Sequence, residues 1–196
     1  MIIVLTGIDG SGKSTAARAL VAAVRAGGGR AMLVSNHAGR RVMSLAAAKL
    51  GVRLPDQLVD AVETVLRVGN VLLSHLRASR FDGLVVMDRH LHCQLALRRA
   101  KGLPRGRFLP WLLARLPQPN AILHLDLDHA EAHRRITARG TDSETLDDLA
   151  AFRSGYRELP EFAGFVQIDA SRTADEVAAD LDARLVFLRL FGRWPA

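Results

Sequence analysis

The feature that most constrains this chain is a glycine-rich loop near its amino terminus. Residues Gly7-Ile8-Asp9-Gly10-Ser11-Gly12-Lys13-Ser14 follow the pattern G-x-x-x-x-G-K-S, between the apolar run 2–5 and a helix-favouring stretch that opens with Thr15. In such a strand–loop–helix unit the backbone N–H groups and the positive end of the helix face an anion. We therefore predict that residues 7–15 bind nucleotide phosphates, with Lys13 on the β- and γ-phosphates and Ser14 on Mg²⁺.

Length and composition suit one soluble domain. The 196 residues are 49% apolar, enough for a sizeable core, so we expect a single domain over 1–196. Cys93 is the single cysteine, which excludes an intrachain disulfide and favours a reducing compartment. The first strand begins at Met1-Ile2 with no signal segment before it, and no apolar run approaches the roughly 20 residues that span a bilayer. We expect a cytoplasmic protein that does not associate with membranes.

The basic charge does not by itself indicate nucleic acid. Arginine and lysine number 27 against 20 acidic residues, a formal charge of +7, and lysine occurs only at 13, 49 and 101. The arginines are spread along alanine-rich stretches, without an aromatic platform for single strands. We expect this charge to serve small polyanions and not nucleic acid.

Short β-branched runs alternate with longer helical patterns along the chain, which is typical of a parallel sheet covered by helices on both faces. We expect strands at 2–6, 31–35, 84–88, 121–126 and 165–169, and helices at about 13–27, 57–79, 91–101, 129–138, 145–157 and 173–190, with further helix near 40–50 and 107–115. Phe108 and Trp111 are expected to pack the short helix against the protein.

Polar residues follow the expected strands at the edge where open α/β sheets bind ligands. Asp88 and Arg89 follow the third strand, and Asn36 and His37 follow the second. A carboxylate at the position of Asp88 commonly lies near the magnesium ion of phosphate-binding loops, although an Asp there also suits a helix cap. Arg89 offers a planar set of donors for phosphate oxygens, which favours a binding site.

A second basic cluster lies late in the chain. Arg135 and Arg139 are four residues apart, so a helix would place them on one face, and Gly140 then interrupts the helix before an acidic segment. Arginines on a closing lid both neutralise a phosphoryl group and exclude water. We predict a lid at approximately 135–147, although a solvated basic helix face would show the same pattern.

Together these segments resemble the thymidylate kinases. The shared segments are the loop 7–15, Asp88-Arg89-His90, the Arg135/Arg139-Gly140 stretch, and the late 168–170 and 175–177, in the family's order over essentially the whole chain. The resemblance implies a three-layer α/β/α P-loop kinase fold, with a five-stranded parallel sheet and an arginine-bearing lid. It also implies transfer of the γ-phosphoryl group of ATP, with Mg²⁺, to dTMP or a related pyrimidine nucleoside monophosphate.

The resemblance assigns roles residue by residue. The loop Gly7, Ile8, Asp9, Gly10, Ser11, Gly12, Lys13, Ser14 and Thr15 would hold ATP, and Ser14, Asp9 and Asp88 would lie at the metal. The catalytic residues would be Lys13, Arg89, Arg135 and Arg139. The acceptor would contact Asp9, Arg67, Asp88, Arg89 and Tyr156, with Tyr156 against its sugar. We add His90 to the acceptor contacts, because His90, His92 and Cys93 diverge on a helix and do not form a zinc site.

The chain departs from the family's pattern on the acceptor side. The usual Arg-Glu-Pro-Gly-Gly-Thr stretch is replaced by residues 35–41, Glu63 or a neighbour stands where an aromatic residue stacks on thymine, and Ala-Tyr-Gln becomes Ala96-Leu97-Arg98. Arg89 with Arg40 or Arg41 is expected to hold the acceptor phosphate. The donor side thus matches the family better than the acceptor side.

Two other functions stay open. A deoxynucleoside kinase needs a carboxylate base, and none follows the second strand, although Asp88 could serve. A non-catalytic nucleotide-binding regulatory protein would share the same loop. The family often forms dimers through its long helices, here 57–79, so a homodimer is also expected from the resemblance.

Overall fold

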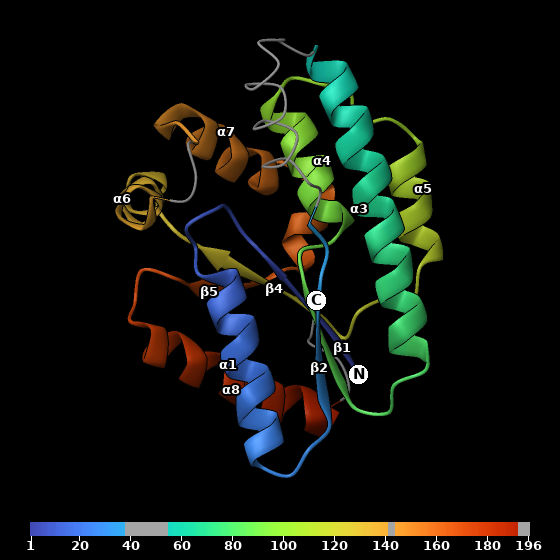
Figure 1. Cartoon of the computed structure of the whole chain (residues 1–196), viewed down its shortest axis with the longest axis vertical. Coiled ribbons are helices and arrows are strands. Elements are labelled where there is room, and N and C mark those ends of the chain that lie inside the picture. The colour runs from blue at the N-terminus through green and yellow to red at the C-terminus, as the bar shows by residue number, and fades with distance from the viewer. Residues whose placement is uncertain (38–54, 141–143, 192–196) are drawn as a thin grey trace.

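A parallel β-sheet organises the computed structural model, which describes residues 1–37, 55–140 and 144–191. Its strands are β1 (Ile2–Thr6), β2 (Ala31–Ser35), β3 (Leu84–Asp88), β4 (Ala121–Asp126) and β5 (Val166–Asp169). They lie in the order β2-β3-β1-β4-β5, and each neighbouring pair is parallel (Figure 1). The expected five-stranded parallel sheet is confirmed, with β5 starting at Val166 instead of Phe165.

The helices follow the expected pattern closely. They are α1 (Lys13–Ala26), α3 (Asp56–Ser79), α4 (Leu91–Ala100), α5 (Phe108–Arg115), α6 (His129–Arg139), α7 (Leu146–Arg157) and α8 (Ala174–Phe191), with a short 3₁₀ helix, η1 (Pro160–Gly164). The helix expected near 40–50 lies outside the described residues. No helix in the described ranges is both long and apolar enough to cross a membrane.

Two helical layers enclose the sheet (Figure 1). Helices α1 and α8 pack together on one face, and α3, α4, α5 and α7 lie on the other. The contact between α4 and α7 is close because Gly155 lies against the backbone of Ala96, where a Cβ would collide with the Ala96 carbonyl oxygen. All five residues of β3 are buried, as expected for a strand covered on both faces. The three-layer α/β/α architecture is therefore confirmed.

The segment predicted as a lid consists of two helix ends. Helix α6 begins at a cap in which the Asp128 side chain accepts a hydrogen bond from Ala130 N at 2.9 Å, and it ends at Gly140, whose φ of 61° is left-handed. Helix α7 begins with a capping box between Thr145 and Asp148. Residues 141–143, between these ends, lie outside the described residues.

The expected packing of α5 is wrong for its two aromatic residues. Phe108 and Trp111 are 55% and 52% exposed, and their rings stack on each other. Helix α5 instead buries Leu109 and Leu112. The periodicity of a short helix identifies its apolar residues but not which of them faces the protein.

Four histidines are buried: His75, His90, His92 and His124. The Nε2 atoms of His75 and His90 lie 3.1 Å apart, and the ring of His90 stacks on that of His92. Burial lowers the pKa of all four imidazoles, to about 4 for His92 and His124. These side chains are therefore neutral in the folded protein at neutral pH.

Buried neutral histidines make stability depend on pH. Between pH 6.5 and about 4 the unfolded chain binds protons that folded His92 and His124 do not, so the free energy of unfolding decreases as pH falls through this window. Each of the two should contribute roughly 2 kcal/mol of the loss between pH 7 and pH 5. Urea denaturation at the two pH values measures it, and His92→Phe should show a smaller difference. Equal stability at both values would contradict this assignment.

Candidate active site

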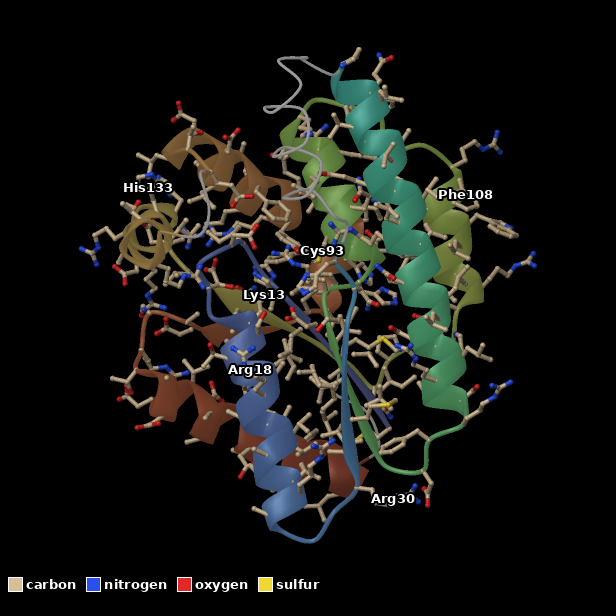
Figure 2. All side chains as sticks on the ribbon, in the orientation of Figure 1. Lys13, Arg18, Arg30, Cys93, Phe108 and His133 are labelled. Atoms are coloured by element: carbon tan, nitrogen blue, oxygen red, sulfur yellow. The ribbon has the colours of Figure 1, made fainter. Side chains whose placement is uncertain are left out.

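The phosphate-binding loop connects β1 to α1 at the carboxyl edge of the sheet. Figure 2 shows Lys13 there, at the first turn of α1. Gly10 has a φ of 85°, and a Cβ on it would lie 2.6 Å from the carbonyl oxygen of Ala132 in α6. Only glycine combines this left-handed conformation with so close an approach to a neighbouring backbone. Gly10 therefore allows the loop to pack directly against the backbone of α6.

Lys13 folds back over its own loop. Its Nζ donates to the Ile8 carbonyl oxygen at 2.6 Å and to Ser11 Oγ at 3.4 Å, and it lies 3.8 Å from Asp9 Oδ1. Burial and the nearby Arg89 charge lower the pKa of the Lys13 ammonium, and the carboxylates beside it oppose this only in part. A buried cation beside a glycine-rich loop suits an anionic ligand.

Ser14 and Asp88 join the loop to the end of β3. Ser14 Oγ donates to Asp88 Oδ2 at 2.5 Å, and the other carboxylate oxygen of Asp88 is buried without a hydrogen-bond partner among the described residues. The N-cap of α4 is His90, so Asp88 does not occupy the capping position that its place in the sequence also allowed. A hydroxyl beside an unpaired carboxylate oxygen fits Mg²⁺, which takes few protein ligands and completes its shell with water and phosphate oxygens.

No other arrangement in the described ranges fits a metal better. No group of three or more His, Cys, Asp or Glu side chains there is placed to hold an ion. Asp9, predicted as a third residue at the metal, instead accepts from Arg89 and faces Lys13. The geometry thus brings Ser14 and Asp88 together and gives Asp9 a different partner.

Arg89 is held across the loop in an unusual backbone conformation. Its φ of 73° is the only positive value for a non-glycine residue in the described chain. Its guanidinium donates to Asp9, and its backbone N–H donates to the Leu5 carbonyl oxygen at 3.1 Å. Burial disfavours the charged guanidinium, but Asp9 and other neighbours outweigh it and raise the pKa of Arg89 above its ordinary value. Arg89 therefore stays a cation at the mouth of the loop.

Asn36 supports this conformation from the end of β2. Its side chain is fully buried, donating to the Arg89 carbonyl oxygen at 2.7 Å and accepting from Ser74 Oγ at 2.8 Å. A left-handed residue other than glycine costs on the order of 1–2 kcal/mol, which these hydrogen bonds offset. The sequence placed Asn36 at this edge but gave no sign of its partner, because the backbone angle of Arg89 cannot be read from residue types.

Besides Asp88, three predicted acceptor residues are buried in the structure. His90 pairs with His75, and Tyr156 has no exposed surface, donating from its hydroxyl to Cys93 Sγ at 2.9 Å and stacking on Phe152. A contact between Tyr156 and a sugar would require these neighbours to move, and it stays a prediction. Arg67 is also buried, but it lies near Arg89, and its Nε donates to Gln94.

The hydrogen-bond partners of Arg135 lie outside the phosphate-binding loop. Its guanidinium donates to Glu131 at 2.7 Å and to the Ala170 carbonyl oxygen at 3.0 Å, so it ties α6 to the segment after β5. Arg139 is the last residue of α6. Their catalytic roles stay predictions, and Arg40 and Arg41, expected at the acceptor phosphate, lie outside the described residues.

Comparison with known proteins gives independent information about the family of this chain. The family model for thymidylate kinase matches residues 5–181. The chain is 33% identical over 196 residues to a thymidylate kinase of Xanthomonas oryzae pv. oryzae (strain PXO99A), covering 95% of this chain and 83% of that protein. It is 30% identical over 190 residues to a probable thymidylate kinase of Pyrobaculum calidifontis, covering 93% and 94%. With the phosphate-binding loop, the Ser14–Asp88 pair and Arg89 assembled at one edge of the sheet, this chain belongs to the thymidylate kinase family.

Proposed function

We propose that this nucleoside monophosphate kinase transfers the γ-phosphoryl group of ATP to dTMP or a related pyrimidine nucleoside monophosphate at the edge formed by the loop, Asp88 and Arg89. The assignment to these residues is supported by the contacts that Ser14, Asp88, Arg89 and Asp9 make with one another. Ser14 donates a hydrogen bond to Asp88, and the Arg89 guanidinium donates to Asp9 in the loop. A site for the donor phosphates therefore lies beside a cation that can bind the phosphate of the acceptor. The reducing cytoplasm, where nucleotides are abundant, is the compartment we propose.

The chemistry requires positioning more than covalent participation. A phosphate oxygen of the acceptor attacks the γ-phosphorus, the bond from that phosphorus to the bridging oxygen of the β-phosphate breaks, and ADP leaves. The loop amides and the Lys13 ammonium hold the β- and γ-phosphates, with Lys13 exchanging its bond to the Ile8 carbonyl for phosphate oxygens. Mg²⁺, held by Ser14 beside Asp88, would neutralise the charge on the donor phosphates.

Arg89 suits the acceptor phosphate. Its guanidinium is already directed at the loop by Asp9, and a phosphate arriving there would share the same planar donors. The lid arginines Arg135 and Arg139 would neutralise negative charge on the transferring phosphoryl group. To do so, Arg135 would have to give up its hydrogen bond to the Ala170 carbonyl oxygen. These motions are part of the proposal.

A monophosphate acceptor fits the geometry better than a nucleoside. A nucleoside hydroxyl needs a base, and Asp88, which the sequence left as the candidate base, accepts a hydrogen bond from Ser14 at the proposed metal position. The described residues after β2, Asn36 and His37, carry no carboxylate. An acceptor that is already anionic needs no base.

Replacing Lys13 tests the donor site. Lys13→Met should lower kcat at least about 100-fold, because the charge on the transferring phosphoryl group loses its cation. The thermal midpoint should not fall, since the variant no longer buries an ammonium group. A coupled assay of ADP release and a thermal melt measure the two quantities, with Lys101→Met, at the exposed end of α4, as the matched control. Turnover like that of the unaltered protein would refute the role of Lys13.

We also infer that the protein forms a homodimer through α3. One face of this helix carries seven large apolar side chains that are between 39% and 71% exposed: Leu58, Val62, Val65, Leu66, Leu72, Leu73 and Leu76. At roughly 100° per residue all seven lie within about 60° of Gly69 around the helix axis. A stripe of this kind on a surface helix marks an interface.

The stripe is arranged for self-pairing. The apolar positions three, four and seven residues before Gly69 have counterparts at the same distances after it, so two antiparallel copies crossing at Gly69 would match apolar side chains with apolar side chains: Leu66 with Leu72, Val65 with Leu73, and Val62 with Leu76. No atom lies within 4 Å of a Cβ built at Gly69, so its open surface permits close approach of a second helix. A two-fold interface pairs the same patch on both subunits.

Gly69→Leu tests this dimer without disturbing the monomer. The side chain would meet nothing within the chain, and leucine is the better helix former, so folding should be unaffected. The dimer mass measured by light scattering should fall to that of a monomer at micromolar concentration. Gly164→Leu, at another position with open space in front of it, should leave the mass unchanged. A monomeric parent protein or a dimeric Gly69→Leu would exclude this interface.

A further inference from the structure

A buried polar network connects α3 to α4 beside Arg89. Asp60 and Arg67 on α3 are 6% and 3% exposed, and Gln94 on α4 is fully buried. Arg67 Nε donates to Gln94 Oε1 at 3.0 Å, and Gln94 Nε2 donates to Asp60 Oδ1 at 2.8 Å. The positive charge of Arg89 contributes to lowering the pKa of Arg67, so this network lies within electrostatic range of the proposed acceptor phosphate site.

The two ends of the network determine how the Gln94 amide is turned. A guanidinium has only donors and an ionised carboxylate only acceptors, so the amide oxygen must face Arg67 and the amide nitrogen must face Asp60. The reverse orientation would oppose donors to donors and acceptors to acceptors. Arg98 holds the carboxylate in place from the far side, with Nε 2.9 Å and Nη2 2.8 Å from Asp60 Oδ2.

One donor of the network is left over. Arg67 Nη1 is buried and has no hydrogen-bond partner within the described part of the chain. An unpaired buried donor costs about 1–3 kcal/mol, more for a charged group, and a ligand that supplies an acceptor atom recovers that cost. An amino group on a base cannot recover this cost, because both it and the guanidinium are hydrogen-bond donors.

We propose that Asp60 is a specificity-determining positioning residue: by fixing the Gln94 amide it holds the Arg67 guanidinium so that the acceptor site favours a base with a carbonyl oxygen over one with an amino group at the same position. This inference rests on the proposed function of the site. Asp60 itself touches no substrate. Sites built to pair a buried polar group discriminate strongly against ligands that leave it unpaired.

The test compares Asp60→Asn with the unaltered enzyme on dTMP and dCMP. An asparagine can present its own amide nitrogen to Gln94, which frees the Gln94 amide to turn. We expect the KM for dTMP to rise about tenfold with kcat within about twofold, and the ratio of kcat/KM for dTMP to that for dCMP to fall about tenfold. Asp175→Asn, an exposed Asp on α8, should leave all three unchanged.

A double-mutant cycle separates this role from general destabilisation. Gln94→Leu leaves the Asp60–Arg98 ion pair in place and should by itself reproduce the loss of discrimination. If Asp60 acts through Gln94, the Asp60→Asn/Gln94→Leu variant should be no worse than Gln94→Leu alone. The proposal would be overturned if the two substitutions lowered the ratio of kcat/KM for dTMP to that for dCMP independently, so that the double variant was worse than Gln94→Leu alone. It would also be overturned if Gln94→Leu left this ratio unchanged, a result that does not depend on whether Asp60→Asn folds.

Failure of the proposed function would be recognised separately. If the unaltered protein phosphorylates no nucleoside monophosphate, that function is wrong, and the dissociation constants of dTMP and dCMP by titration calorimetry still report on Asp60. A lower dTMP preference in Asp60→Asn would then support its role in binding. Equal preferences in the two proteins would contradict it.

Discussion

The hydrogen bond from Ser14 to Asp88 is the contact on which the rest of the site depends. It joins the first turn of α1 to the end of β3, two segments far apart in the sequence, and it buries a carboxylate directly beneath the phosphate-binding loop. Such a carboxylate is costly unless paired, and a hydroxyl on one side leaves room for a cation on the other. The junction brings the first turn of α1 next to the segment that carries Arg89, the residue after Asp88.

The charges in the site balance one another. Lys13 is a buried cation and Arg89 a partly buried one, and Asp9 and Asp88 are the carboxylates that accompany them. Lys13 uses a backbone carbonyl, and Arg89 uses Asp9, as partners that phosphate oxygens can replace. Binding of a polyphosphate would therefore exchange existing partners and would not require further charged side chains of the protein to be buried.

Much of the fold, and the position of the phosphate-binding loop within it, followed from the sequence. The loop motif predicted the β1–α1 junction, and buried β-branched runs such as that before Asp88 predicted the parallel strands, because both depend on local residue types. Side-chain partnerships between distant elements were not predictable. The clamp of Asn36 on Arg89, the tie from Arg135 to Ala170 and the network through Asp60 depend on helix and strand registers that only the folded chain defines.

The central claim is that one phosphoryl group passes from ATP to a nucleoside monophosphate within this cluster. Phosphorus NMR of the protein with ATP, Mg²⁺ and dTMP tests it directly, because it separates transfer from hydrolysis and from simple binding. We expect the signals of dTDP and ADP to grow together in equal amounts, without inorganic phosphate. Release of inorganic phosphate alone, or an unchanged spectrum, would contradict it.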